Sequence, residues 1–349
     1  MLEVIGAGVG NDVNTKTDFV AVFNASEKKA QLDTMLNKSG VTSASADVPA
    51  LQFSSKRAAS SATQTKFLIQ RFRDVYWRAP SYNISRFVVN AFFAFVLGLT
   101  YLDTDFDTYQ AINSGQGMLY YGSLFLGLIS FNSVIPLTFQ ERPSFYRERA
   151  SQTYNAWWYF LGGTLVEIPY VLLNTFVFTS IFFPMVGFIG IDRFISFWLN
   201  LTLYVLLQTY WAQVLVFSFP SPEIAETVGL LVLIVSVFLC GFNPPASAIP
   251  AGWKWLHYLT PHTYTLAILS ATAFGDCGDG ASLTEVDCTV ISNLPPTLTP
   301  NMTVKEYIEE MFYMRHDEIW RNFAAVIAFI VVFRFMVLFA MRFFNFQKR

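Results

Sequence analysis

Charged residues are scarce in this chain. Asp, Glu, Lys and Arg make up 14% of its 349 residues, against roughly 25% in an ordinary soluble domain. Hydrophobic residues make up 53%, and 36 residues are phenylalanine. A soluble fold of this length cannot bury so much apolar surface, so the composition predicts an all-α protein whose solvent is the lipid bilayer.

Cysteine and histidine are also rare, with three residues of each type. None of them cluster at zinc-ligand spacing, so no metal site is predicted. The net charge of −2 provides no overall field that would favour nucleic acid as a partner. The first ten residues lack both a basic segment and a long apolar core. We therefore expect no cleavable signal peptide, and a later span must direct insertion.

The first 65 residues differ in composition from the rest. Residues 26–36 predict one short amphipathic helix with Ser26 as its cap, and residues 41–62 are a Ser/Ala/Pro-rich linker. We expect residues 1–65 to be a cytosolic linker and not a core-forming domain. Residues 66–79 alternate basic and aromatic side chains at helical spacing. They predict a helix in the membrane interface, with a soluble surface helix as the alternative.

Six apolar runs follow, each close to the roughly 20 residues that cross a bilayer. They cover residues 84–102, 118–139, 158–183, 194–219, 224–242 and 320–341. Basic residues gather before the first run, between the second and third, and after the sixth. By the positive-inside rule both termini are cytosolic, and residues 243–318 form a large outer loop.

The outer loop has three features that predict its structure and modification. The prolines of residues 243–250 break any helix, and the apolar residues 263–274 are too few to cross, which predicts a re-entrant segment before the last span. Cys277 and Cys288 lie in a polar stretch on the oxidising side, so a disulfide is favoured over two free thiols. Asn301 begins an Asn-Met-Thr sequon and is predicted to be glycosylated.

Two charged residues, Glu167 and Arg334, lie inside apolar runs. A charge within the membrane is costly and requires a partner. Both positions are two to three turns from the cytosolic ends of their spans, so the two side chains are candidates to pair. They form either a gating contact or a purely structural ion pair, and snorkelling toward the interface is a further alternative.

The order of these elements is specific, and so are several phrases. They are Arg78-Ala-Pro-Ser-Tyr-Asn83, Glu141-Arg-Pro-Ser-Phe-Tyr-Arg-Glu-Arg-Ala150, Glu167-Ile-Pro169 and Cys240-Gly-Phe242. The chain resembles the ABC-2 type membrane domain of G-subfamily ABC exporters, and in particular the second membrane half of pleiotropic-drug-resistance transporters. The resemblance covers about residues 60–349, with the membrane domain at residues 66–349.

The resemblance implies export of lipophilic compounds, whether drugs, lipids or sterol-like molecules, with nucleotide-binding domains and a second membrane half as partners. The sequence has no Gly-x-x-x-x-Gly-Lys-Ser/Thr phosphate loop. We therefore expect no enzyme activity or bound cofactor in this chain itself, with ATP and Mg²⁺ held by nucleotide-binding domains absent from it. It is then a fragment or truncated product of a longer transporter, or an orphan membrane half. The plasma membrane is the expected location, with vacuolar or other endomembranes as alternatives.

The resemblance also implies functional positions. The segment after the second span would be a cytosolic coupling helix, with Glu141, Arg147, Glu148 and Arg149 as contacts, and an ordinary solvated loop is the alternative. A substrate pathway between spans two and five would be lined by Phe125, Leu126, Ile129, Ile234, Val237 and Phe242. These side chains alternatively pack between helices or face lipid. Two other functions are open: an ATP-independent channel or carrier, and a non-transporting membrane scaffold.

Overall fold

The computed structural model describes residues 19–38, 41, 57, 59–102, 104–277 and 286–346. The chain divides into two units, residues 1–58 and residues 59–349. The first unit holds α1 (Phe19–Asn24) and α2 (Glu27–Leu36). The Ser26 hydroxyl accepts a hydrogen bond of 3.2 Å from the backbone N–H of Lys29, so the predicted cap does begin α2. Most of the predicted linker, residues 41–62, lies outside the described residues.

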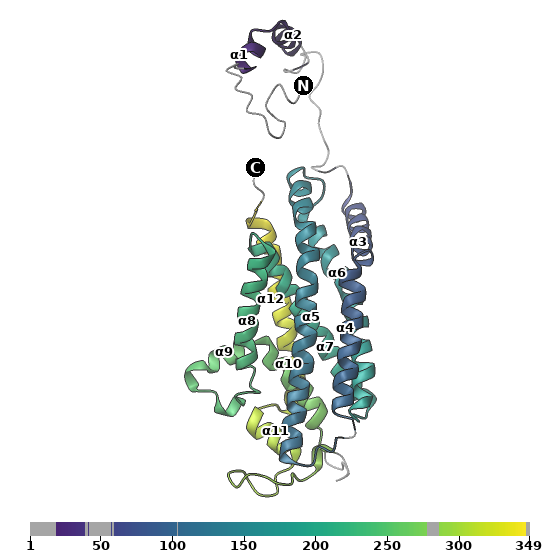
Figure 1. The fold of residues 1–349 in the computed structure, drawn as a ribbon, viewed down its shortest axis with the longest axis vertical. Helices are drawn as coiled ribbons and strands as arrows, with labels where there is room; N and C mark the ends of the chain where they lie inside the picture. The colour runs from purple at the N-terminus through teal and green to yellow at the C-terminus, as the bar shows by residue number, and fades with distance from the viewer. Residues whose placement is uncertain are drawn as a thin grey trace, which may run out of the picture. The chain divides into compact units, whose positions relative to one another are not determined.

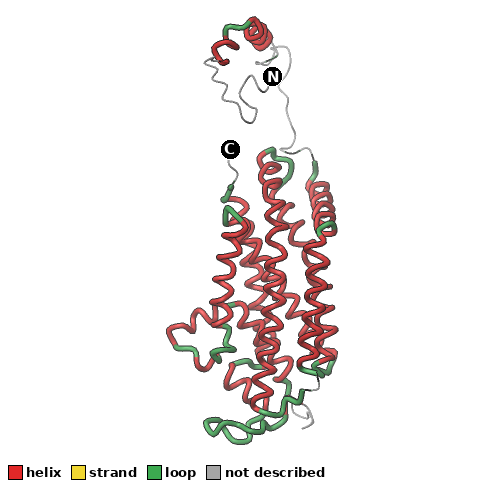
Figure 2. Tube along the Cα trace, in the orientation of Figure 1, coloured by secondary structure: helices red, strands yellow, loops and turns green. Residues whose placement is uncertain are grey.

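The second unit is a bundle of helices (Figures 1 and 2). Its described residues contain no strand, only two isolated bridges. The helices are α3 (Ser61–Trp77), α4 (Pro80–Thr100), α5 (Tyr109–Ala150), α6 (Ala156–Met185), α7 (Ile191–Ser218), α8 (Pro222–Leu239), α9 (Lys254–Leu259), α10 (Pro261–Phe274), α11 (Val304–Phe312) and α12 (Ile319–Phe343).

Six of these helices are long and apolar enough to cross a membrane: α4, α5, α6, α7, α8 and α12. They confirm the six predicted spans. The largest difference in bounds is at α5, which has 42 residues and ends at Ala150 instead of residue 139. The charged segment expected as a coupling helix is therefore a continuation of the span, because its polar residues keep the helix going past the apolar run. The prolines Pro136 and Pro143 lie inside it.

Helix α7 forms the centre of the bundle. In its most apolar stretch 83% of the residues are buried, against 11% in α8 and 22% in α4. Polar residues of α7 such as Asn200 and Thr202 are therefore enclosed by protein, and their hydrogen bonds go to α10 and α6. The exposed apolar faces of α4 and α8 are the surfaces suited to lipid or to another membrane subunit.

Helices α3 and α10 are the shorter members of the bundle. Buried Leu68, Phe72 and Tyr76 fix α3 against α6. Helix α10 has 14 residues, or about 21 Å, which is shorter than the hydrocarbon core. It is almost wholly buried among α7, α12 and α5. The interfacial position of α3 and the re-entrant nature of α10 stay predictions.

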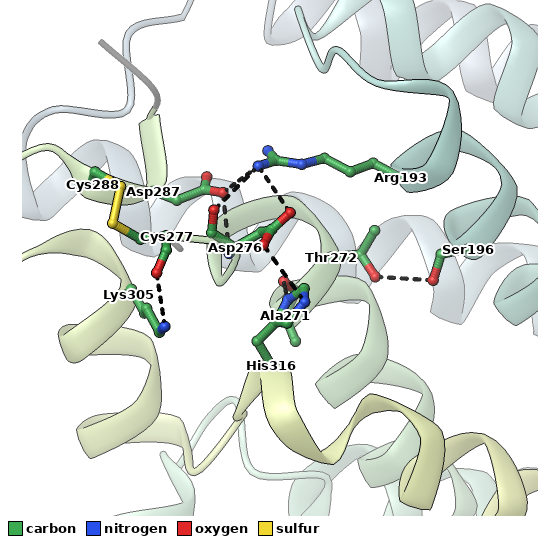
Figure 3. Close-up of polar contacts among 10 residues, drawn as sticks. All are labelled: Arg193, Ser196, Ala271, Thr272, Asp276, Cys277, Asp287, Cys288, Lys305 and His316. Atoms are coloured by element: carbon green, nitrogen blue, oxygen red, sulfur yellow. Dashed lines mark hydrogen bonds and ion pairs between the residues drawn. A yellow bond between two sulfur atoms is a disulfide. The ribbon is translucent and has the colours of Figure 1, made fainter. Parts of the chain in front are cut away.

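At the end of the bundle that carries α11, a covalent and ionic cluster joins distant segments (Figure 3). Cys277 and Cys288 form a disulfide with a Cα–Cα distance of 5.3 Å. The Arg193 guanidinium, at the start of α7, lies 2.9 Å from the Asp287 carboxylate and 3.4 Å from that of Asp276. Nζ of Lys305, on α11, donates to the carbonyl of Cys277 at 3.1 Å. The residues beside the two cysteines are thereby held on both α7 and α11.

The predicted glycosylation site lies beside α11. Asn301 is exposed, and its backbone φ of 60° falls in the left-handed region. Thr303 of the same sequon caps α11, where it takes part in a capping box with Glu306. Glycosylation of Asn301 stays a prediction.

Candidate functional site

The charged extension of α5 is bound to α3 through one arginine. Arg71 donates to the carboxylate of Glu148 at 2.7 and 2.8 Å and to that of Glu141 at 2.7 Å. All three side chains are between 22% and 32% exposed. Burial acts to lower the pKa of Arg71, but the hydrogen bond with Glu148 and the two carboxylate charges outweigh it and raise that pKa. Arg71 is therefore a permanent cation joining two helices.

The turn after α5 is fixed to the same cluster. The Tyr154 hydroxyl donates to Glu148 at 2.7 Å, and the Gln64 side chain accepts from the backbone N–H of Asn155 at 2.9 Å. Burial and the bond to Glu148 both raise the pKa of Tyr154, so its hydroxyl stays protonated and keeps donating. We call Arg71, Glu141, Glu148 and Tyr154 the α3–α5 clamp.

The other two predicted coupling residues lie elsewhere. Arg149 donates to the backbone carbonyls of Met341 and Arg342 at the end of α12, the second at 2.8 Å. Arg147 is exposed and makes one long contact of 3.4 Å with Ser144. The structure thus joins Glu141 and Glu148 to α3 and joins Arg149 to α12. Arg147 faces outward.

Two arginines of this region were not predicted as site residues. In the sequence, Arg71 is only one of several basic residues in the predicted interfacial helix, residues 66–79. Arg142 donates to the carbonyls of Val216 and Phe219 at 2.5 Å and of Pro220 at 2.7 Å, which closes the C-terminal end of α7. The sequence shows that Arg71 and Arg142 are basic residues next to apolar runs, but it does not indicate which groups they bind.

Deeper in the bundle, Arg86 of α4 and Glu167 of α6 form an ion pair of 3.1 Å. They are 3% and 0% exposed. Arg86 also donates to Tyr82 at 2.6 Å, to Ser130 of α5 at 3.1 Å and to Thr209 of α7 at 3.1 Å. Glu167, one of the two candidates for a pair with Arg334, is thus paired with Arg86, because the register of α4 places Arg86 against it. Arg86 was missed although it also lies inside an apolar run.

Arg334 of α12 is bonded to neutral groups. It donates to Gln213 at 2.5 Å, to the carbonyl of Phe160 at 3.2 Å and to the Thr164 hydroxyl. Its guanidinium carbon lies 4.3 and 4.4 Å from the ring centroids of Phe160 and Tyr210. Arg334 and Glu141 line one cavity of about 30 Å³, a volume that suits a water molecule.

A larger cavity, of about 570 Å³, opens between α5, α7, α8, α9, α10 and α12. We call it the α8 cavity. Its size is typical of sites for small molecules, and its few polar side chains include Gln208 and Ser236. It is lined by Phe131, Leu207, Gln208, Trp211, Gly229, Leu231, Val232, Leu233, Val235, Ser236, Leu256, Leu259, Thr260, Pro261, Phe329, Val332, Phe333 and Met336.

None of the six predicted pathway residues is among these lining residues. Leu126 is fully buried in the core, and its role in a substrate pathway stays a prediction. Phe242 stacks on Tyr120 of α5 at a centroid distance of 4.8 Å, and the Val237 carbonyl lies 3.5 Å from the Tyr120 hydroxyl.

The remaining three predicted pathway residues are dispersed. Phe125 is exposed and packs on Phe93 of α4 at 4.8 Å. Ile234 is 50% exposed, and Ile129 is half-buried. The cavity therefore involves the predicted spans two and five, but from a different face of α8.

The described residues contain no group of three or more His, Cys, Asp or Glu side chains placed to hold a metal ion. Chemically, the site offers a charged inter-helix clamp at one end and an apolar cavity within the bundle.

Comparison with known proteins agrees with this arrangement. Residues 63–274 match the family described as ABC-2 type transporter, and residues 281–349 match the CDR ABC transporter family. Pleiotropic drug resistance protein 1 of Petunia hybrida is 30% identical over 353 residues, covering 100% of this chain and 23% of that protein.

Two relatives from Arabidopsis thaliana, ABC transporter G family members 36 and 40, are 28% and 30% identical, again over 100% of this chain and 23% of their own length. The chain thus spans less than a quarter of the curated relatives it matches, and the matched family describes a membrane domain, not a catalytic one. With six spans, a buried polar core and similarity along its whole length, the chain belongs to the ABC-2 type transporter family and is the membrane part of such a transporter.

Proposed function

We propose that this chain is the membrane half of an ATP-driven exporter of lipophilic compounds. Its substrate passes through the helix bundle, and ATP is hydrolysed by a nucleotide-binding part that lies outside residues 1–349. Relatives named for pleiotropic drug resistance align along the whole chain, which supports export of varied lipophilic compounds. Residues 1–65 then link the membrane domain to the preceding nucleotide-binding domain, and a second membrane half completes the pathway.

The observation that carries the coupling role is the α3–α5 clamp. A charge-assisted hydrogen bond is about twice as strong as a neutral one, and Arg71 makes such bonds with both Glu141 and Glu148. Arg149 fixes the same extension to the end of α12. A partner that pushes on the outward-facing Arg147 therefore moves α3, α5 and α12 together, and their spans tilt with them.

The α8 cavity is the proposed place of the substrate. Its walls are largely apolar, so affinity comes from buried area and not from many directed hydrogen bonds. Gln208 and Ser236 supply the few polar contacts. This composition suits flat lipophilic molecules and explains how one site would accept several of them.

The orientation is part of the proposal. The end of the bundle that carries the clamp and the end of α12 faces the cytosol, and the disulfide-bonded end faces outside. The basic residues of α3 and α5 and the sequon at Asn301 support this assignment. The plasma membrane is the proposed location.

The test uses the transporter assembled from this chain, its nucleotide-binding parts and its second membrane half. Glu148→Gln removes the charge that Arg71 holds while keeping the shape of the side chain. ATP-dependent efflux is expected to fall roughly tenfold at equal surface level, the effect of losing one charged hydrogen bond from the coupling path. Binding of substrate to the α8 cavity is expected to stay unchanged.

Asp74→Asn is the matched control, because Asp74 lies on the same helix and its one ion pair among the described residues is with its exposed neighbour Arg73. Normal efflux in Glu148→Gln would exclude the coupling role of the clamp. Transport by the isolated chain in proteoliposomes without ATP would instead favour a carrier.

A further inference from the structure

Helix α8 is attached to the bundle by its first half. Its buried residues are Ala225 and Gly229, about one turn apart, whereas Leu231, Val232 and Val235 farther along are exposed. The α8 cavity begins where this packing ends. Gly229 is the first residue of α8 in the cavity wall, and the other α8 residues in the wall lie between positions 231 and 236. The contact of Gly229 with the bundle therefore marks one end of the cavity.

The closeness of this contact requires a glycine. A Cβ atom at residue 229 would overlap Cζ of Phe131, on α5. It would also lie 2.9 Å from Cε2 of the same ring and 2.9 Å from Cδ1 of Leu215, on α7. Non-bonded carbon atoms prefer a separation of about 3.5–4.0 Å. A larger residue at position 229 would therefore displace the ring or push α8 away from α5 and α7.

Phe131 closes this end of the cavity. Its side chain is 3% exposed and belongs to the same buried cluster as Leu215 and Ala225. Phe131 also lines the α8 cavity, and neither Leu215 nor Ala225 does. The ring is therefore the last surface that a molecule in the cavity meets before the packed core.

Other walls of the cavity reach the surface of the bundle. Leu231 of α8, Leu259 of α9 and Val332 of α12 all line the cavity, and all are more than half exposed. A molecule in the cavity can protrude past these side chains, whereas at Phe131 it meets buried ones. The Phe131 end therefore limits how deeply a rigid molecule can enter.

We propose that Phe131, held against Gly229, determines the specificity of the α8 cavity by selecting ligands for length. Its ring sets the longest rigid lipophilic molecule that lies fully inside. The inference rests on the proposed function, because it takes the α8 cavity as the substrate site. It adds a class of preferred substrate, rigid and elongated apolar molecules up to a fixed length.

The experiment uses the full chain purified in detergent. The probes are diphenylpolyenes, rigid rods in which one to four conjugated double bonds separate the two rings. Trp211 lines the cavity, so a bound probe is detected by saturable energy transfer from tryptophan. The parent is expected to bind the shorter rods and to lose roughly tenfold in affinity at the first rod that is too long, because about two carbons then stay unburied.

Phe131→Ala is expected to shift this limit to the next longer rod, with a gain in affinity of roughly tenfold for that rod. Truncating a buried phenylalanine also costs stability, so size-exclusion chromatography checks that the variant folds. Phe131→Leu is the milder variant, and a smaller gain in the same direction is expected.

Phe217→Ala is the matched control. Phe217 is also 3% exposed and lies on α7, but it does not line the α8 cavity. Its length limit should equal that of the parent. Combining Phe131→Ala with Gly229→Phe supplies the ring from α8 in place of α5, and this double variant should restore the parent's limit.

Three results would overturn this inference and leave the proposed function standing. They are an unchanged limit in both Phe131 variants, an equal shift in Phe217→Ala, and no return of the limit in the double variant. Absence of saturable energy transfer from the parent to every rod would overturn the inference together with the placement of substrate in the α8 cavity. The expected limits in an assembled transporter without ATP-dependent efflux would support the inference and count against the exporter function.

Discussion

Two arginines buried in the bundle, Arg86 and Arg334, are accommodated in different ways. Both are less than 10% exposed. Arg86 faces the carboxylate of Glu167 at 3.1 Å, whereas the bonds of Arg334 go to an amide, a carbonyl and a hydroxyl, with two aromatic rings against its guanidinium. In the first case one residue compensates the charge. In the second case the compensation is shared among several dipoles, so no single partner carries all of it.

Substitution of Glu167 tests the difference between the two arginines most strongly. Glu167→Ala leaves Arg86 as a buried cation without a counter-charge, which costs roughly 3–5 kcal/mol. We expect a correspondingly large loss of stability in detergent, measured by thermal unfolding with a size-exclusion readout.

The double variant Arg86→Met with Glu167→Met is the control for this prediction, because replacing both charges by apolar groups leaves no unpaired ion. It should recover most of the lost stability. A double variant no more stable than Glu167→Ala would show that the pair acts through more than charge compensation.

The second comparison removes one neutral partner from each arginine. Gln213→Leu takes the amide from Arg334 and is expected to cost roughly 1.5–3 kcal/mol, the range for hydrogen bonds to charged groups. Thr209→Val takes a hydroxyl from Arg86 and should cost about 1 kcal/mol, because Glu167 still compensates the charge. Unfolding midpoints of the two variants measured side by side check the order. The reverse order would mean that the carbonyl of Phe160, the hydroxyl of Thr164 and the two rings hold Arg334 without the amide of Gln213.

An effect as small as that of Thr209→Val is expected when Arg334 itself is removed. Arg334→Met deletes the charge and leaves only neutral partners, of which Thr164 already donates to the carbonyl of Phe160 at 2.7 Å. The expected loss of stability is about 1 kcal/mol. If thermal unfolding instead shows a loss as large as that of Glu167→Ala, then compensation by dipoles is not the reason that Arg334 is tolerated.

The spans were predictable because a bilayer demands apolar runs of fixed length, and hydropathy reports such runs directly. The end of α5 was not predictable in this way. Hydropathy marks only the apolar part of a helix, whereas the backbone hydrogen bonds of α5 continue to Ala150. The same limit explains why the coupling segment was expected as a separate helix.

Partners were harder to predict than charges. Glu167 was recognisable as a costly residue, but its partner depends on how α4 and α6 are rotated and shifted relative to each other. Glu148 was likewise recognisable, whereas Arg71 lies 77 positions away along the chain. Leu126 shows a further limit: it lies in the core, and the sequence does not state which side of α5 is buried.

The length of α5 has a mechanical consequence. A helix of 42 residues is about 63 Å long. A rotation of about 5° around its midpoint therefore displaces each end by about 3 Å in opposite directions. Pro136 and Pro143 each remove one backbone hydrogen bond near the charged end. The part of α5 that bends most easily therefore lies next to the segment on which a partner would push. The long arm of α5 in the membrane then moves as one stiff piece.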